Sequence, residues 1–187
     1  MDGTATSILH VSQLAEALGL PPPASGPPAR DAADAAAVLD AWLDRLRAAS
    51  WPALLEPTPA RGRSLRNLTV NVFHPFELLP AAWSSGEFDW RPEDDGEREA
   101  TLTGPDELVA FAEAAAAGWR RFLDEHDLAG AESLVETSRG AVPFSTLVAF
   151  QRWHAAYHYR QLLVVLGRPG GLEPLGLADL ELPSDVF

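Results

Sequence analysis

The stretch that decides the fold is Gln151-Arg152-Trp153-His154-Ala155-Ala156-Tyr157-His158-Tyr159-Arg160-Gln161-Leu162, in the last long amphipathic segment of the chain. His154 and His158 are one helical turn apart, so on a helix their imidazoles project from the same face. At about 100° per residue, Leu147 shares that face, whereas Arg152 and Tyr159 point elsewhere. Because unpaired polar groups in a core cost free energy, two inward histidines need partners, and such a pair can chelate a metal ion.

Four segments have the apolar periodicity of amphipathic helices, and none is convincing as a sheet. They cover residues 31–49, 64–83, 103–126 and 143–167. Ser64 and Thr103 are the expected N-caps of the second and third helices, and Gly167 is expected to end the fourth. Four helices of this length predict an all-α fold, a four-helix bundle.

The segments outside the helices suggest how the chain is organised. Residues 1–30 form a short N-terminal appendage and a proline-rich linker, and residues 31–187 form the bundle with an irregular C-terminal tail. The acidic stretch 84–100 contains Phe88 and Trp90, so we expect a loop that packs onto the bundle and borders its site.

Composition limits the classes of function. The 187 residues are 47% hydrophobic and 22% charged, which is typical of one compact globular domain. A formal charge of −13 argues against nucleic acid as a partner, because such binding relies on Lys and Arg. No apolar run is long enough to span a membrane and no signal peptide is evident, so a cytoplasmic location is expected. With no cysteine in the chain, thiol chemistry would need an external thiol.

A third histidine lies on the second helical segment. His74 has apolar neighbours at Val70 and Leu78, so it is expected to face inward as well. Facing helices of a bundle commonly share a metal, and three neutral imidazoles leave a coordination position open, as in catalytic zinc sites. We therefore expect His74, His154 and His158 to bind one divalent metal ion. Pro75 predicts a kink directly after the first of these ligands.

These residues resemble the DinB-like, or YfiT-like, four-helix metal-binding superfamily. The resemblance rests on Asn71-Val72-Phe73-His74-Pro75-Phe76-Glu77 and on His154-Ala155-Ala156-Tyr157-His158-Tyr159-Arg160-Gln161-Leu162. It implies an up-down-down-up bundle, with one histidine on the second helix and an H-x-x-x-H pair on the fourth. The superfamily includes thiol S-transferases, mycothiol-dependent maleylpyruvate isomerase and domains joined to sulfoxide synthases.

The thiol-using branch implies a metal-dependent S-transferase or isomerase acting on a small electrophilic substrate. Zinc is the first expectation for the metal, with nickel or iron as alternatives, and a low-molecular-weight thiol such as mycothiol is the cosubstrate. Glu77, Tyr157 and Gln161 are the candidate catalytic residues: Glu77 as a base, Tyr157 as a donor to substrate, and Gln161 as a group that orients a ligand imidazole.

Several alternatives stay open on sequence alone. In one alternative, the three histidines are ordinary core residues whose ring nitrogens form hydrogen bonds with one another or with the surrounding helices. A noncatalytic module that binds a metal or small molecule needs the same fold, and iron-dependent oxidative sulfur chemistry is the third reading. Gln151 is a further candidate for orienting an imidazole, and Arg66 for meeting a substrate carboxylate, whereas His10 and His126 are expected to have surface roles. The chain is also compatible with a homodimer.

Overall fold

A computed structural model describes residues 26–59, 62–91, 94–138, 140–167 and 171–182. The described chain is mainly helical, as predicted. Four long helices dominate: α2 (Pro28–Ala48), α4 (Leu65–Ser85), α6 (Pro105–Glu125) and α7 (Phe144–Val165). Two shorter helices, α3 (Trp51–Leu55) and α5 (Asp94–Thr101), and two 3-10 turns, η1 (Leu128–Gly130) and η2 (Glu173–Leu175), connect or flank them.

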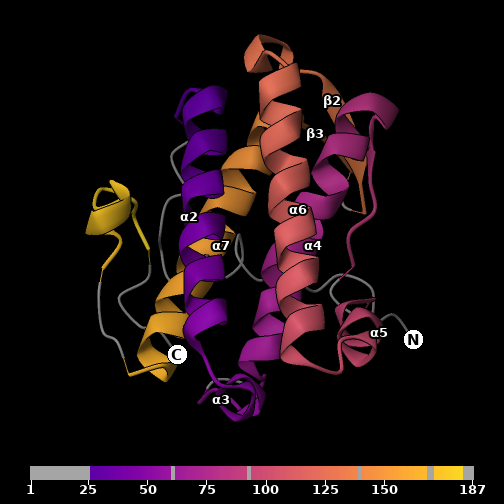
Figure 1. Ribbon diagram of the computed structural model, residues 1–187. Coiled ribbons are helices and arrows are strands. Elements are labelled where there is room, and N and C mark those ends of the chain that lie inside the picture. Colours follow the sequence, from indigo (N-terminus) through magenta and orange to yellow (C-terminus); the bar gives the residue numbers. More distant parts are fainter. Residues whose placement is uncertain (1–25, 60–61, 92–93, 139, 168–170, 183–187) are drawn as a thin grey trace.

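The four long helices form the predicted up-down-down-up bundle. The colour gradient of Figure 1 shows α2 and α7 running in one direction and α4 and α6 in the other. α2 packs against α7 and α6, and α4 packs against the same two helices. α4 and α6 are therefore parallel neighbours, and the chain between them must cross the full length of the bundle.

That crossover contains structure that the sequence did not predict. It starts with the short strand β1 (Glu87–Phe88) and then forms α5 at the end of the bundle where α4 and α6 begin (Figure 1). β1 pairs in parallel with β2 (Leu134–Thr137), which pairs antiparallel with β3 (Gly140–Pro143). The sequence did not predict this small sheet, but the described chain is mainly helical and the prediction of an all-α fold is confirmed.

The helix ends follow the expected chemistry with one correction. Ser64 caps α4, and its hydroxyl accepts a hydrogen bond from Asn67 N at 3.0 Å. The N-cap of α6 is Gly104 rather than Thr103. The carboxylate of Glu107 instead accepts hydrogen bonds from the Thr103 hydroxyl and from the backbone N–H groups of Thr103 and Gly104, and these bonds lower the pKa of Glu107. α4 is continuous through Pro75, and the predicted kink at this residue stays a prediction.

The core is aromatic and includes one buried ion pair. Trp42 of α2 packs edge-on against Phe73 of α4 and contacts Tyr159 of α7. Arg152 of α7 is also buried, and its guanidinium donates to Asp31 of α2 at 2.5 Å. Arg152 and Tyr159 lie off the histidine face, as predicted, and both are buried because α7 packs against both α2 and α4.

The two ends of the chain are described only in part. Most of the predicted appendage, residues 1–25, lies outside the described residues. After α7 the chain runs through η2 as the irregular tail that the sequence predicted, and Leu172 and Leu177 are buried against the bundle. Trp153 fixes the tail by donating from its indole Nε1 to the carbonyl of Glu181 at 3.0 Å. No helix in the described part of the chain is long and apolar enough to cross a membrane.

Candidate functional site

The histidine pair lies on α7, where the helix faces α4. His154 is 5% exposed, and its ring centroid is 4.6 Å from that of His158. The ring of Trp90, from the crossover after α4, lies 5.4 Å from the His154 ring and covers it. The two imidazoles therefore lie together, as the four-residue spacing predicted, with His154 buried and His158 half-buried.

Two side chains that the sequence did not single out connect this pair to His74. The side-chain Oδ1 of Asn71, on α4, lies 3.0 Å from Nε2 of His154. Its amide nitrogen donates to Asp95 Oδ2 at 2.7 Å. Asp95 Oδ1 lies 2.9 Å from Nδ1 of His74 and also accepts from Trp90 Nε1 at 3.3 Å. His74 therefore reaches the pair through Asp95 and Asn71.

Burial controls the charge of His154. Its removal from water, followed by the nearby His158 and then by the positive charge of Arg63, holds the pKa of His154 well below the usual value of 6.5. His154 is therefore neutral at neutral pH. A neutral imidazole has a lone pair on one nitrogen, which is the form that binds a metal ion or accepts a proton.

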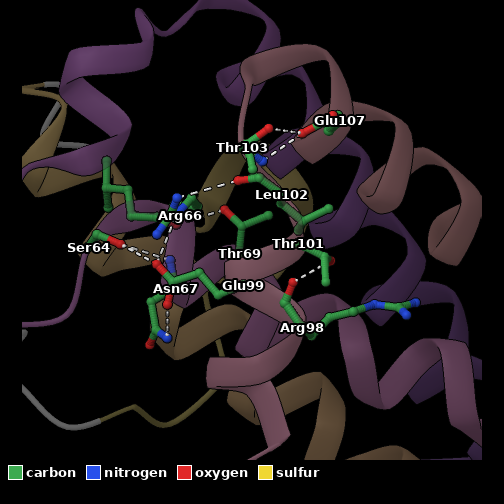
Figure 2. A network of polar contacts seen from close by, with 11 residues as sticks. Ser64, Arg66, Asn67, Thr69, Arg98, Glu99, Thr101, Leu102, Thr103 and Glu107 are labelled. Carbon is green, nitrogen blue, oxygen red and sulfur yellow. Dashed lines mark hydrogen bonds and ion pairs between the residues drawn. The ribbon is translucent and has the colours of Figure 1, made fainter.

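Helix α5 is held against the start of α4 by a second polar network. Glu99 accepts hydrogen bonds from the Ser64 hydroxyl, from Arg66 Nε at 2.8 Å and from Asn67 Nδ2 at 2.6 Å. Figure 2 shows these three side chains of α4 and its N-cap converging on Glu99. The contact fixes the helix that carries Asp95, so it positions the site from a turn away.

A pocket of about 530 Å³ lies beside this network, and none of the three histidines lines it. Asn71 and Asp95 form part of its wall, so a ligand in the pocket would lie next to the groups that hold His154 and His74. Two guanidinium groups and several polar side chains line the rest, together with one exposed apolar residue: Leu55, Gly62, Arg63, Ser64, Arg66, Asn67, Gly96 and Glu99. The stretch 84–100 thus borders the site, as expected.

Of the three candidate catalytic residues, Gln161 and Tyr157 lie beside His158, whereas Glu77 does not. Gln161 Oε1 lies 2.6 Å from Nδ1 of His158, which suits the predicted orienting role. Tyr157 stacks on Trp153 and lies edge-on to His158, with ring centroids 5.4 Å apart in both pairs. Glu77 is exposed on α4 and pairs with Arg98 of α5 at 2.5 Å.

Other polar candidates lie in or near the bundle. Gln151 is fully buried, and neither heteroatom of its amide makes a hydrogen bond within the described part of the chain. Arg66 lines the pocket, where it is already paired with Glu99. His126 packs on Phe122 at the far end of α6, and His10 lies outside the described residues.

The donor set suits a divalent metal, but the ligands are not gathered. Nδ1 of His154 is buried and makes no hydrogen bond to the described residues, so its lone pair is available. The tethered nitrogens of His74 and His158 follow a pattern common for metal-binding imidazoles, in which the second nitrogen is held by a carboxylate or carbonyl. Among the described residues, however, no three His, Cys, Asp or Glu side chains are placed to hold one metal ion.

Comparison with known proteins bears on the fold. No family model matches the sequence, and no curated protein matches it either. A solved structure does match: the crystal structure of a histidine-to-alanine mutant of the mycothiol-dependent maleylpyruvate isomerase, with a TM-score of 0.62 and 19% sequence identity. The likeness establishes the fold. The matched region covers 73% of this chain but only 61% of that enzyme. At this sequence identity, the likeness does not show that the two proteins share an activity.

Proposed function

We propose that this protein is a metal-dependent enzyme that uses a low-molecular-weight thiol on a small electrophilic substrate, as an S-transferase or a thiol-assisted isomerase. The observation that carries the proposal is the neutral, buried His154 of the four-helix bundle. Its Nδ1 makes no hydrogen bond to the described residues, and its ring lies beside that of His158. The structural neighbour is named as a mycothiol-dependent isomerase, which is additional support.

His74, His154 and His158 are the proposed ligands of one divalent metal ion, with zinc expected before nickel or iron. Since no three described His, Cys, Asp or Glu side chains are placed to hold one metal ion, the proposal requires His74 to move towards His154 and His158 when the metal binds. The bound metal would stabilise a thiol as thiolate at neutral pH. The absence of cysteine is compatible with a thiol cosubstrate that diffuses in.

The remaining residues have proposed roles around that centre. Gln161 holds the His158 ring by accepting from its Nδ1–H, and Trp90 excludes water from one side of His154. The pocket is the proposed place of the electrophile, where Arg63 and Arg66 suit a carboxylate on the substrate or the thiol. Tyr157 lies beside His158 and is the proposed hydrogen-bond donor to substrate, whereas the contact of Glu77 with Arg98 suits tethering of α5.

A thiol-consumption assay tests this function. Zinc-loaded protein would be mixed with mycothiol, bacillithiol or glutathione and a panel of small electrophiles, and free thiol would be followed with time. His158→Ala should lose both metal and turnover, whereas Tyr157→Phe should keep the metal and turn over about 10-fold or more slowly. His126→Ala, which changes a histidine away from the site, is the matched control. Metal-loaded protein that neither binds nor consumes a thiol would favour a noncatalytic binding module.

A further inference from the structure

The hydrogen bonds around Asn71 determine which nitrogen of His154 carries its proton. A carboxylate has no hydrogen to donate when ionised, so Asp95 Oδ2 can face only the NH₂ group of Asn71, at 2.7 Å. The opposite side of the amide, Oδ1, then faces Nε2 of His154 at 3.0 Å. An amide oxygen only accepts, so Nε2 must be the nitrogen that bears the hydrogen.

The other carboxylate oxygen prevents the reverse arrangement. Asp95 Oδ1 faces Nδ1 of His74 and Nε1 of Trp90, and the indole nitrogen is always a donor. The side chain of Asp95 is only 3% exposed, so hydrogen bonds from these donors are the main interactions that offset the cost of burying its carboxylate. Both oxygens therefore accept, and the direction of the whole series of bonds from Asp95 to His154 is fixed.

The far nitrogen of His154 agrees with this direction. Nδ1 is buried and has no hydrogen-bond partner among the described residues. A proton there would be a buried donor with nothing to accept it, at a cost of about 1–3 kcal/mol. A lone pair at the same position costs less than an unpaired N–H and is the form that can bind a cation.

We propose that Asp95, acting through Asn71, is a positioning residue that holds His154 as the Nε2–H tautomer and so makes Nδ1 the nitrogen that this histidine offers to a metal ion. The use of that nitrogen for metal rests on the proposed function, whereas the tautomer does not. Asp95 belongs to α5, in the crossover between α4 and α6, so the crossover determines which atom of α7 is available.

The replacement Asp95→Asn gives a sharp test, because it should invert the tautomer. The new amide would keep its oxygen towards Trp90 and His74, which are donors, and turn its NH₂ group towards Asn71. Asn71 would then rotate to accept that bond and present its own NH₂ group to His154. Nε2 of His154 would have to accept, and the proton would move to Nδ1.

Exchanging the two side chains should restore the original tautomer. In the double variant Asn71→Asp with Asp95→Asn, a carboxylate at position 71 accepts from Nε2 of His154 and from the amide at position 95. Every hydrogen bond of the series is kept, with the negative charge moved by one residue. Glu97→Gln is the matched control, because Glu97 is an exposed acid on the same helix.

The readout is the pair of imidazole ¹⁵N shifts of His154 in metal-free protein at pH 7.5, assigned by loss of the signal in His154→Gln. Wild type, Glu97→Gln and the double variant should show a protonated Nε2, and Asp95→Asn a protonated Nδ1. A protonated Nδ1 in wild type, an unchanged tautomer in Asp95→Asn, or an inverted one in the double variant would each overturn the proposal. If Asp95→Asn does not fold, wild type and the double variant still decide the result.

Zinc titration of the same proteins separates this inference from the proposed function. We expect Asp95→Asn to bind zinc about 10- to 100-fold more weakly and the double variant to recover most of that loss. Equal zinc affinity in wild type and Asp95→Asn would contradict the use of Nδ1 as a ligand atom. A wild-type protein with the expected tautomer but no zinc affinity would contradict the metal-dependent function and leave the role of Asp95 intact.

Discussion

His154 combines three properties that ordinary core histidines rarely share. It is 5% exposed, its Nε2 is engaged by Asn71, and its Nδ1 makes no hydrogen bond to the described residues. Burial is also the largest cause of its lowered pKa. Since a core position usually satisfies both ring nitrogens, these properties support the proposed role of His154 as a metal ligand.

The lowered pKa of His154 predicts how stability depends on pH in metal-free protein. Below pH 6.5 the unfolded chain binds a proton at this histidine, whereas the native protein does not until a much lower pH. The free energy of unfolding should therefore fall as pH drops through and below 6.5, by about 1.4 kcal/mol per pH unit from this residue.

Urea unfolding at pH 7.5 and pH 5.5 measures the effect. The wild type should lose about 1 kcal/mol more than His154→Gln over this interval, because glutamine does not titrate. Identical losses in the two proteins would show that His154 binds its proton equally well in the folded and unfolded states.

Among the helices, α5 contributes a buried acid, Asp95, to the candidate site. It contributes Asp95 to the histidines and Glu99 to the start of α4, and the salt bridge from Arg98 to Glu77 adds a third contact. The residues of α5 are mostly charged or polar, so the burial of apolar side chains contributes little to holding this helix in place. We infer that these polar contacts, with the burial of Trp90 beside it, fix the helix against the bundle.

Removing the Glu99 carboxylate should loosen α5. Glu99→Ala deprives the Ser64 hydroxyl, Arg66 and Asn67 of their acceptor, and Glu99 is 16% exposed at its side chain. The expected loss in stability is about 1–3 kcal/mol. Amide hydrogen exchange across residues 94–101 should accelerate in this variant but not in Glu97→Ala. Unchanged exchange would mean that α5 is held by other contacts.

The sequence predicts these elements unevenly, for physical reasons. The long helices are visible because each has a periodic run of apolar residues, and Ser64 is a recognisable cap at the start of α4. α5 has no such stripe and contains Gly96, and β2 and β3 are too short to show an alternating pattern. The burial of Arg152 and Tyr159 was not predicted, because it depends on the packing of α7 against two neighbouring helices.

At the scale of the whole molecule, the site joins parts of the chain that are far apart in sequence. His154 and His158 were predictable because their spacing is local, and His74 because it lies on a strongly periodic segment. The contacts of Asn71 with His154 and of Asp95 with His74 depend on tertiary packing, and nothing in the acidic run around Asp95 distinguishes it from its neighbours. The embedded Phe88 and Trp90 were the local signs that this run packs onto the bundle, and both are buried.

The proposed function depends most directly on whether the bundle binds a metal at these histidines. Elemental analysis of the purified wild type, His154→Ala and His126→Ala, each dialysed against buffer with trace zinc, measures this. We expect about one divalent metal ion per chain in wild type and in His126→Ala, and a loss of most of it in His154→Ala. No bound metal in wild type, or equal metal in wild type and His154→Ala, would contradict the account.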